Sequence, residues 1–397
     1  QDWNPDPRCR VRYDERMEPL ESRLKQHARS LGFDLVGIAP AGPADGFNRL
    51  RDWLDRGFAG DMGYMHRHAE ARRHPAAVLP NVRSVVMLGM NYNPGREEEI
   101  EERQCGRIAR YARGADYHDV LRERLNRLLA WLQAERPGCV GRGVVDTAPL
   151  LERDFARRAG LGWFGKNTML LNKRLGSYLF LAALLVNAEL RPDAPFEAMH
   201  CGSCTACLDA CPTDAFVGPG VLDSRRCISY LTVELKGAVP AELRRGVGDW
   251  LFGCDICQEV CPWNRKAPAA SEPAWRARPD LESVDPIELL ALTEEEFGRR
   301  FRATALMRTK RRGLLRNAAL VLGNVGDERA LPALRRALND SELIVQEAAV
   351  WAMTEIERRV NASPPLPPSL SCASPNPPGC PPAAPPRGAS PPPSPPV

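Results

Sequence analysis

Eight cysteines between residues 201 and 261 constrain this chain more than any other feature. Residues 201–212 read C-x₂-C-x₂-C-x₃-C-P, and residues 254–262 read C-x₂-C-x₃-C-P. The first pattern is typical of [4Fe–4S] sites, where three closely spaced thiolates bind one cubane and the fourth cysteine reaches another. The second run lacks its first cysteine because Leu251 occupies that position, and Cys227 is the one nearby cysteine that can replace it. The segment therefore provides two complete sets of four.

The spacing also determines how the eight ligands are divided. Because the fourth cysteine of such a run ligates the other cluster, each run contributes to both clusters. We assign one cluster to Cys201, Cys204, Cys207 and Cys261. We assign the second cluster to Cys211, Cys227, Cys254 and Cys257. Structural zinc favours two C-x₂-C pairs separated by a loop, and disulfides are uncommon without a secretion signal. Both alternatives therefore account for the pattern less well.

Composition limits the partners and the compartment. The net charge is +4 over 397 residues, so contact with nucleic acid must come from local clusters of basic residues. No apolar run approaches the roughly 20 residues that a membrane span needs. Thirteen cysteines, eight of them in metal-type spacing, favour a reducing compartment. We therefore expect a cytoplasmic protein with no membrane partner.

Helical and strand patterns alternate over residues 17–187, which we take as one domain. The spacing of apolar residues predicts helices over 18–30, 45–56, 116–135 and 149–159. Apolar runs predict strands over 33–39, 84–92, 140–145 and 177–187. This alternation indicates a sheet covered by helices, of the α+β or α/β class.

Composition divides the rest of the chain. Residues 188–268 are expected to form a ferredoxin-like domain with two clusters, with short helices over 223–233 and 240–252. Residues 269–360 are mostly helical and contain one HEAT-like repeat, with an Ala-Ala pair at 318–319 and another at 348–349. Such helices must stack on another part of the chain to bury their faces. Residues 1–16 and the proline-rich tail 361–397 are expected to be disordered.

Several short segments resemble the epoxyqueuosine reductase family when taken together. They are residues 110–118 (Arg-Tyr-Ala-Arg-Gly-Ala-Asp-Tyr-His), 144–147 (Val-Val-Asp-Thr), 165–167 (Gly-Lys-Asn), 176–178 (Gly-Ser-Tyr) and 316–319 (Arg-Asn-Ala-Ala). The cysteine arrangement, with Cys227 alone inside residues 226–232, also fits. The resemblance covers roughly residues 18–358, and the combination is far more specific than any single motif.

The resemblance implies a cobalamin-dependent iron–sulfur enzyme. Such enzymes reduce epoxyqueuosine in the anticodon loop of tRNA to queuosine, the last step of queuosine biosynthesis. It implies electrons that pass from an external low-potential donor of the ferredoxin or flavodoxin type through two [4Fe–4S] clusters to cobalamin, which rests as cob(II)alamin. We expect a monomer whose tRNA partner carries epoxyqueuosine. Two alternatives are a corrinoid enzyme similar to reductive dehalogenases and a non-enzymatic, ferredoxin-like electron carrier.

Asp146 is the predicted catalytic residue. It follows an apolar strand, where a carboxylate can line a site at the edge of a sheet, and the matching aspartate in the family is the proton donor. The alternative is that Asp146 caps the next helix. The resemblance also implies that five residues contact cobalamin: Arg72, Tyr111, Asp146, Ser177 and Ser229. For Arg72, a solvated basic turn is an equally good interpretation.

His118 lies in a pattern close to D-x-H-x-x-G, in which a histidine can ligate cobalt. The glycine is missing and the residues begin a predicted helix, so we favour a helix cap at Asp116 and a polar role for His118. The family is likewise thought to bind cobalamin without a histidine ligand.

A basic run lies at the entry to the helical repeat, next to Arg299, Arg300 and Arg302. We predict that it binds tRNA phosphates, because clustered positive charges dominate affinity for nucleic acids. The predicted contacts are Arg308, Lys310, Arg311, Arg312 and Arg316. The alternative is an ordinary solvated helix face.

Overall fold

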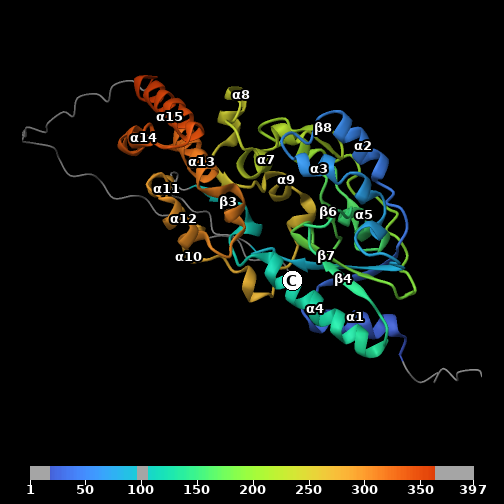
Figure 1. The fold of residues 1–397 in the computed structure, drawn as a ribbon. Helices are drawn as coiled ribbons and strands as arrows, with labels where there is room; N and C mark the ends of the chain where they lie inside the picture. Colours follow the sequence, from blue (N-terminus) through green and yellow to red (C-terminus); the bar gives the residue numbers. More distant parts are fainter. Residues whose placement is uncertain (1–17, 96–105, 363–397) are drawn as a thin grey trace, which may run out of the picture.

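The computed structural model describes residues 18–95 and 106–362. A sheet with its helices lies at one end of the molecule, the C-terminal helices lie at the other, and the cysteine-rich segment lies between them (Figure 1). The predicted extension 1–16 and nearly all of the predicted tail 361–397 fall outside these ranges, although Asn361 and Ala362 end the last helix. Across the described ranges, no helix has the length and apolar character needed to cross a membrane.

The main sheet has four strands in the order β1-β2-β7-β4, and each pairing is antiparallel. The strands are β1 (Leu35–Pro40), β2 (Ser84–Asn91), β4 (Gly141–Val144) and β7 (Leu179–Val186). Three of the four strands lie inside the predicted strands, and β1 extends one residue beyond its predicted end. The alternation of helices and strands along the chain nevertheless does not produce parallel strands. Every residue of β2 is buried, so both faces of the sheet must be covered.

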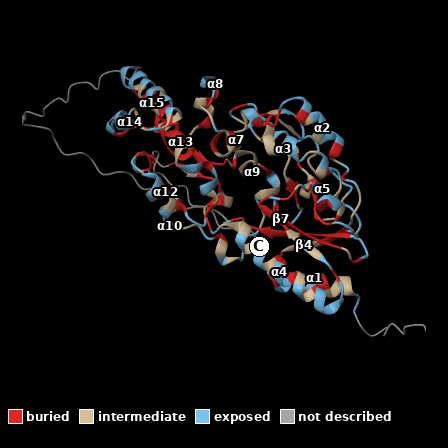
Figure 2. Ribbon diagram, viewed as in Figure 1, coloured by how far each residue is buried: buried red, intermediate tan, exposed pale blue. Residues whose placement is uncertain are grey.

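Helices cover both faces. On one face α1 (Leu20–Ser30) and α4 (Tyr117–Glu135) pack against alternate residues of β2 and β7. On the other face lies α5 (Glu152–Arg158), which begins three residues later than predicted. The connection between β1 and β2 contains α2 (Phe47–Asp55) and α3 (Gly63–Arg67). Figure 2 shows buried residues concentrated along β7, between helices whose outer sides are exposed.

The cysteine-rich segment consists of short elements. Its helices are α6 (Ala206–Asp209), α7 (Ile228–Val233), α8 (Ala241–Arg244) and α9 (Ile256–Glu259). Two hairpins lie within or beside it, β5 (Trp163–Phe164) with β6 (Leu170–Leu171), and β8 (Phe216–Gly218) with β9 (Val221–Leu222). A third short sheet pairs β3 (Arg107–Ile108) with β10 (Trp250–Phe252) in parallel.

Two predicted helices in this segment need correction. The helix predicted over 240–252 is wrong beyond Val247, because Gly248 has a φ of +61° and β10 follows. The helix predicted over 223–233 is interrupted at Cys227, whose backbone is extended with φ −72° and ψ 125°. Cys227 therefore lies at the start of α7 and not inside a helix.

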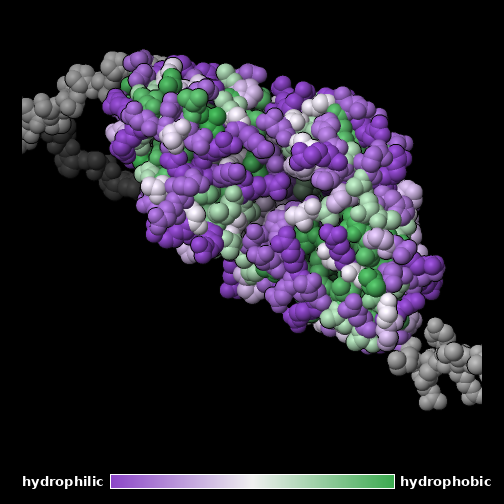
Figure 3. Space-filling model, in the orientation of Figure 1, coloured by the Kyte–Doolittle hydropathy of each residue, from purple (hydrophilic) through white to green (hydrophobic). Residues whose placement is uncertain are grey.

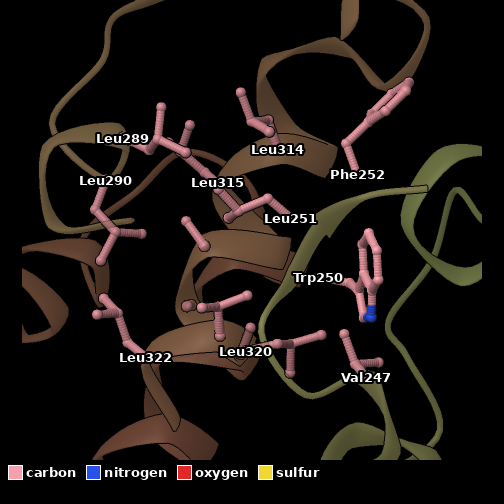
Figure 4. Close-up of a cluster of buried hydrophobic side chains, with 14 of the residues drawn as sticks. Val247, Trp250, Leu251, Phe252, Leu289, Leu290, Leu314, Leu315, Leu320 and Leu322 are labelled. Carbon is pink, nitrogen blue, oxygen red and sulfur yellow. The ribbon is translucent and has the colours of Figure 1, made fainter. Parts of the chain in front are cut away.

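The C-terminal helices share a core with the cysteine-rich segment. They are α10 (Pro279–Glu282), α11 (Pro286–Leu289), α12 (Glu294–Phe301), α13 (Lys310–Val325), α14 (Leu331–Ala337) and α15 (Leu343–Ala362). Leucines of α13 pack against Trp250 and Leu251 of β10 (Figure 4). The repeat therefore stacks on the segment that carries the cysteines, as its unpaired apolar faces require.

Arg316 lies in this shared core, and its side chain is 1% exposed. Its guanidinium group donates hydrogen bonds to the backbone carbonyls of Leu231, Leu235 and Gly237. Burial, together with nearby Arg312, lowers the pKa of Arg316 to about 10. The structure contradicts the prediction that Arg316 contacts tRNA, because α13 turns this side chain inward and its donors are already used.

Replacing Arg316 with Met should lower the apparent free energy of unfolding by about 3 kcal/mol, because one buried and two partly buried carbonyls lose a charged donor. Urea denaturation measures the loss. Lys310→Met is the matched control, since Lys310 begins the same helix and is exposed, and we expect a change below about 0.5 kcal/mol. Equal stability of Arg316→Met and the parent protein would contradict this structural role.

Candidate redox centre and active site

The first set of cysteines faces a common cavity of about 280 Å³. The cysteines that line it are Cys201, Cys204, Cys207 and Cys261. Lys166 also lines the cavity, and its ammonium group donates to the carbonyls of Gly202 and Cys204 at 2.8 and 2.9 Å. Trp163 packs edge-on against Trp263, which closes one side. The structure thus brings together the four residues predicted for the first cluster.

The second set lies deeper in the protein. Burial, and then the proximity of other thiols, raises the pKa of Cys227, Cys254 and Cys257. The charge of the Cys211 thiolate raises the pKa of Cys227 and Cys254, and that of Cys227 raises the pKa of Cys257. These mutual effects show that the four residues predicted for the second cluster also lie close together.

The arrangement of the thiols fits cubanes. All nine cysteines in the described ranges are free thiols. In the same ranges, no group of three or more His, Cys, Asp or Glu side chains is placed to hold a single metal ion. A cubane requires a wider spacing, because each of its four thiolates binds a different iron. The donor chemistry and the cavity therefore fit two [4Fe–4S] clusters.

A second constellation surrounds Asp146. The hydroxyl group of Tyr117 donates to Oδ2 of Asp146, and Nε2 of His118 lies 2.8 Å from Oδ1. The other ring nitrogen of His118, Nδ1, lies 2.7 Å from Oδ1 of Asp116. Asp116 also caps α4 by accepting a hydrogen bond from the His118 amide at 3.0 Å. Both ring nitrogens of His118 are therefore committed to carboxylates, and neither is free to ligate cobalt.

Asp146 itself lies in a strained loop after β4. Its φ is +35°, a region that residues other than glycine rarely occupy and that is often found at functional sites. Its amide donates to Oε1 of Glu152 at 2.7 Å, so α5 holds the loop in place. The N-cap of α5 is Leu151, with no side-chain cap. The alternative that Asp146 merely caps this helix is therefore wrong.

Two neighbours of Asp146 have perturbed pKa values. Burial alone lowers the pKa of His118, but the hydrogen bonds to Asp116 and Asp146 outweigh it and raise the pKa to about 9. Burial raises the pKa of Glu152 to about 8, and the nearby charge of Asp146 adds to the increase. At pH 7 His118 therefore carries a positive charge and Glu152 is protonated.

Arg72 approaches the same site from the turn Glu70–Arg73. It is 9% exposed, and it donates to the carbonyl of His68 at 3.0 Å. Burial lowers the pKa of Arg72, while Tyr64 and Glu152 oppose this effect. Arg72 is therefore a buried residue near Glu152, and the interpretation as a solvated turn is wrong.

Arg308 connects the helical repeat to this site. Burial lowers its pKa, but the charge of Glu234, with which it pairs at 2.7 Å, outweighs this effect and raises the pKa. Tyr64 and Asp146 are near enough to add to the increase. Figure 3 shows the molecular surface hollowed at the centre of the view, between the sheet end and the helical end. Arg308 thus belongs to the surroundings of Asp146 as well as to the predicted tRNA-binding run.

Tyr111 and Ser229 lie on two further elements near the centre. Tyr111 has its ring centroid 6.3 Å from that of Tyr117 and 6.1 Å from that of Phe252. Burial is the main cause of the raised pKa of Tyr111, and the charge of Asp146 contributes to the increase. Ser229 lies in the first turn of α7, two residues after Cys227.

Ser177 has no recorded contact with the residues around Asp146 in the described part of the chain. It is 1% exposed, and its hydroxyl oxygen accepts hydrogen bonds from Gln258 and Asn264, both at 3.0 Å. These bonds join the start of β7 to the second cysteine run. The contact of Ser177 with cobalamin stays a prediction, and its hydroxyl oxygen is already bound between two parts of the protein.

Three residues of these sites were missed by the sequence analysis. Tyr117 and Lys166 lie inside the family segments 110–118 and 165–167. The resemblance singled out these segments, but it gave neither residue a role. Glu152 gave no signal, because only the strained loop brings it to the amide of Asp146.

Family models match three regions of the chain. Residues 200–264 match "4Fe-4S double cluster binding domain", residues 72–147 match "Epoxyqueuosine reductase QueG, DUF1730", and residues 301–369 match "HEAT repeats". Together with the fold and the two sets of thiols, these matches define an iron–sulfur protein with a double-cluster domain and a helical repeat.

Relatives match nearly the whole described chain. The epoxyqueuosine reductase of Pseudomonas aeruginosa is 42% identical over 84% of this chain and 94% of its own, and that of Escherichia coli K12 is 40% identical over 86% and 91%. The chain belongs to the epoxyqueuosine reductase family and is a reductase. This confirms the resemblance found in the sequence and excludes a non-enzymatic electron carrier.

Two solved structures of the family are similarly close. An epoxyqueuosine reductase with an epoxyqueuosine-modified tRNA-Tyr stem loop has a TM-score of 0.80 and 34% identity, and covers 87% of this chain and 94% of its own. The Bacillus subtilis enzyme, in which a catalytic loop with an aspartate is swung out of the active site, has a TM-score of 0.79 and 35% identity, and covers 85% and 90%.

Replacing Cys227 with Ser should remove one of the two clusters. Iron and acid-labile sulfide measured after anaerobic reconstitution should fall from about eight to about four of each per chain. Cys139→Ser is the control, because Cys139 is buried and free but belongs to neither set. Full iron content in the Cys227 variant would contradict its assignment as a ligand.

His118 should titrate near pH 9 in the folded protein. Because this pKa exceeds the ordinary value of 6.5, His118 stabilises the fold fully below about pH 6.5, and this contribution is lost as the pH rises through about 9. Histidine NMR spectra follow the titration, with His118→Gln providing the assignment. Asp116→Asn should lower the midpoint by about one unit. Asp119→Asn, in the same helical turn, should leave it unchanged, and a midpoint near 6.5 in the parent protein would contradict the account.

Proposed function

We propose that this chain reduces epoxyqueuosine in tRNA to queuosine. The family membership supports the substrate class, since a solved relative binds an epoxyqueuosine-modified tRNA stem loop. The observation that carries the proposal is the junction at Asp146, where Tyr117 and His118 converge on one carboxylate. Arg308, which lies in the turn before α13, is also near this carboxylate. A carboxylate held by two hydrogen-bond donors is a suitable group for proton transfer.

The residues near Asp146 fit cobalamin bound without a protein ligand to cobalt. His118 is committed at both nitrogens, which agrees with such a mode of binding. Arg72, Tyr111 and Ser229 are the residues that would hold the corrin. When bound, cobalamin would supply a low-potential cobalt centre for delivering electrons to the substrate, and the two [4Fe–4S] clusters would supply single electrons from an external donor.

The reaction requires two electrons and two protons for each epoxide, whose oxygen leaves as water while a carbon–carbon double bond forms. A proton must reach the oxygen as its bond to carbon breaks. At pH 7 the His118 imidazolium shares its proton with Oδ1 of Asp146 across 2.8 Å. The proton of His118 can therefore pass through the carboxyl group of Asp146 to the developing oxyanion, which leaves a neutral His118 to be reprotonated.

Asp116 and Glu152 act behind this pair. Asp116 holds Nδ1 of His118, so that Nε2 faces Asp146, and its negative charge stabilises the imidazolium. Glu152 fixes the amide of Asp146 by accepting its hydrogen bond. Its own carboxyl group is protonated at pH 7, because burial raises its pKa to about 8.

The tRNA-binding surface is proposed from the residues of the basic run that remain accessible. Lys310 and Arg308 are exposed, and within the described ranges the ion pair of Arg312 is a long one, with Glu342 at 3.8 Å. Arg311 pairs with Asp340 at 2.6 Å, with its side chain 14% exposed, so it contributes less. Because Arg308 also lies near Asp146, this surface would lead a splayed base towards that carboxylate.

Asp146→Asn should reduce turnover by about 10² to 10⁴-fold, the usual contribution of a general acid. Both clusters should remain, because Asp146 is remote in sequence from the ligands and touches none of them among the recorded contacts. The assay follows conversion of epoxyqueuosine-containing tRNA under anaerobic conditions with dithionite, with Asp119→Asn as control. Full activity of the Asp146 variant would overturn its role, and an inactive parent protein with intact cofactors would overturn the proposed function.

Lys310→Glu combined with Arg312→Glu should weaken tRNA binding and reduce the slope of log affinity against log salt by about 0.7 to 0.9 for each lost phosphate contact. Filter binding over a series of salt concentrations measures both quantities. Arg29→Glu, on the exposed face of α1, serves as control. Affinity and slope equal to those of the parent protein would exclude this surface.

A further inference from the structure

The first cluster site reaches the protein surface at one edge. Residues 202–205 are exposed, and they include Cys204, whose thiol lines the cavity of the first set. In the second set, by contrast, each of the four cysteines is at least partly buried. An electron from outside would therefore meet the first set before the second.

Basic side chains lie on two segments next to residues of the same cavity. Lys173 and Arg174 lie in the turn after β6, and the Lys173 ammonium group lies 5.9 Å from the Phe196 ring centroid. Arg265 and Lys266 follow Trp263, which lines the cavity. The two segments are neighbours, because the Ser177 amide donates to Asn264 at 2.7 Å.

These four basic residues, which we call the basic rim, are all exposed. None of the four forms an ion pair with a carboxylate of the described residues. Lys166 adds a fifth positive charge at the cavity itself. The carboxylates carried by the same surrounding segments are Glu197, Asp209 and Asp214. The rim therefore keeps a positive excess beside the exposed cysteine.

An apolar contact lies within the same area. Met199 is 65% exposed and immediately precedes His200, which lines the cavity. A small apolar centre with a charged rim is the usual composition of a transient protein interface. Complementary charge at such a surface mainly raises the association rate and selects the partner.

We propose that the basic rim, with Met199, is the docking surface for a small acidic protein that carries single electrons, and that electrons enter this enzyme at the first cysteine set. The proposal rests on the proposed function, since it requires both clusters to be present. It assigns the two sets different tasks: the first accepts electrons from the partner, and the second passes them towards the site at Asp146.

Binding is tested directly with recombinant ferredoxin and, in a second arm, recombinant flavodoxin as probes. The rim variant carries Lys173→Glu, Arg174→Glu, Arg265→Glu and Lys266→Glu, and leaves Lys166 intact because it supports the ligand loop. At low salt its affinity for the carrier should fall at least tenfold. The control carries Arg29→Glu, Arg49→Glu, Arg127→Glu and Lys236→Glu, four exposed positions on other elements, and should bind like the parent protein.

Turnover separates docking from chemistry. With saturating dithionite, which needs no docking surface, the rim variant and the parent protein should convert epoxyqueuosine-containing tRNA within a factor of two. With the reduced carrier as sole donor, the rim variant should lose at least tenfold. Equal affinity of rim variant and control, or binding of neither carrier by the parent protein, would overturn the docking proposal. Failure of all proteins with dithionite would instead overturn the proposed function, while the affinities would still test the rim.

Discussion

The structure depends on the grouping of eight thiols into two sets, with each cysteine run contributing to both sets. Cys254 and Cys257 lie with one set, whereas Cys261, four residues later, lies with the other. Buried thiols without a cation resist ionisation, as the raised pKa values of Cys254 and Cys257 show, and iron reverses that preference by binding thiolates. Cluster binding and folding of residues 200–264 are therefore coupled, because ligands from both ends of the segment must meet.

The helical repeat supports this arrangement from outside. Asn317 of α13 is fully buried and donates to the carbonyls of Thr232 and Leu251, both at 2.8 Å. These carbonyls lie a few residues from Cys227 and Cys254, so α13 braces the chain segments that carry ligands of the second set. The turn before the same helix carries Arg308 towards Asp146. One element thus connects the proposed RNA surface, the predicted second cluster site and the proposed site of proton transfer.

Local sequence patterns predicted the features that depend on residues close together in the chain. Cysteine spacing predicted the four cysteines that line one cavity, and apolar periodicity located the four strands of the main sheet. Tertiary contacts determined the rest. The guanidinium of Arg316 looked like part of a basic surface, but helix packing turned it into the core. Ser177 was taken from a family segment, yet its hydroxyl is bound by Gln258 and Asn264 from another run of the chain. Glu152 could not be predicted, because its role depends on the positive φ of Asp146.

The most direct test of this account is the iron–sulfur content of the unmodified protein after anaerobic reconstitution, determined by Mössbauer and electron paramagnetic resonance spectroscopy. The account predicts two [4Fe–4S] clusters per chain, with about eight irons, and coupled signals after reduction. A single cluster, or bound zinc in place of iron, would contradict it, because the eight thiols would then not form two cluster sites that each draw cysteines from both runs.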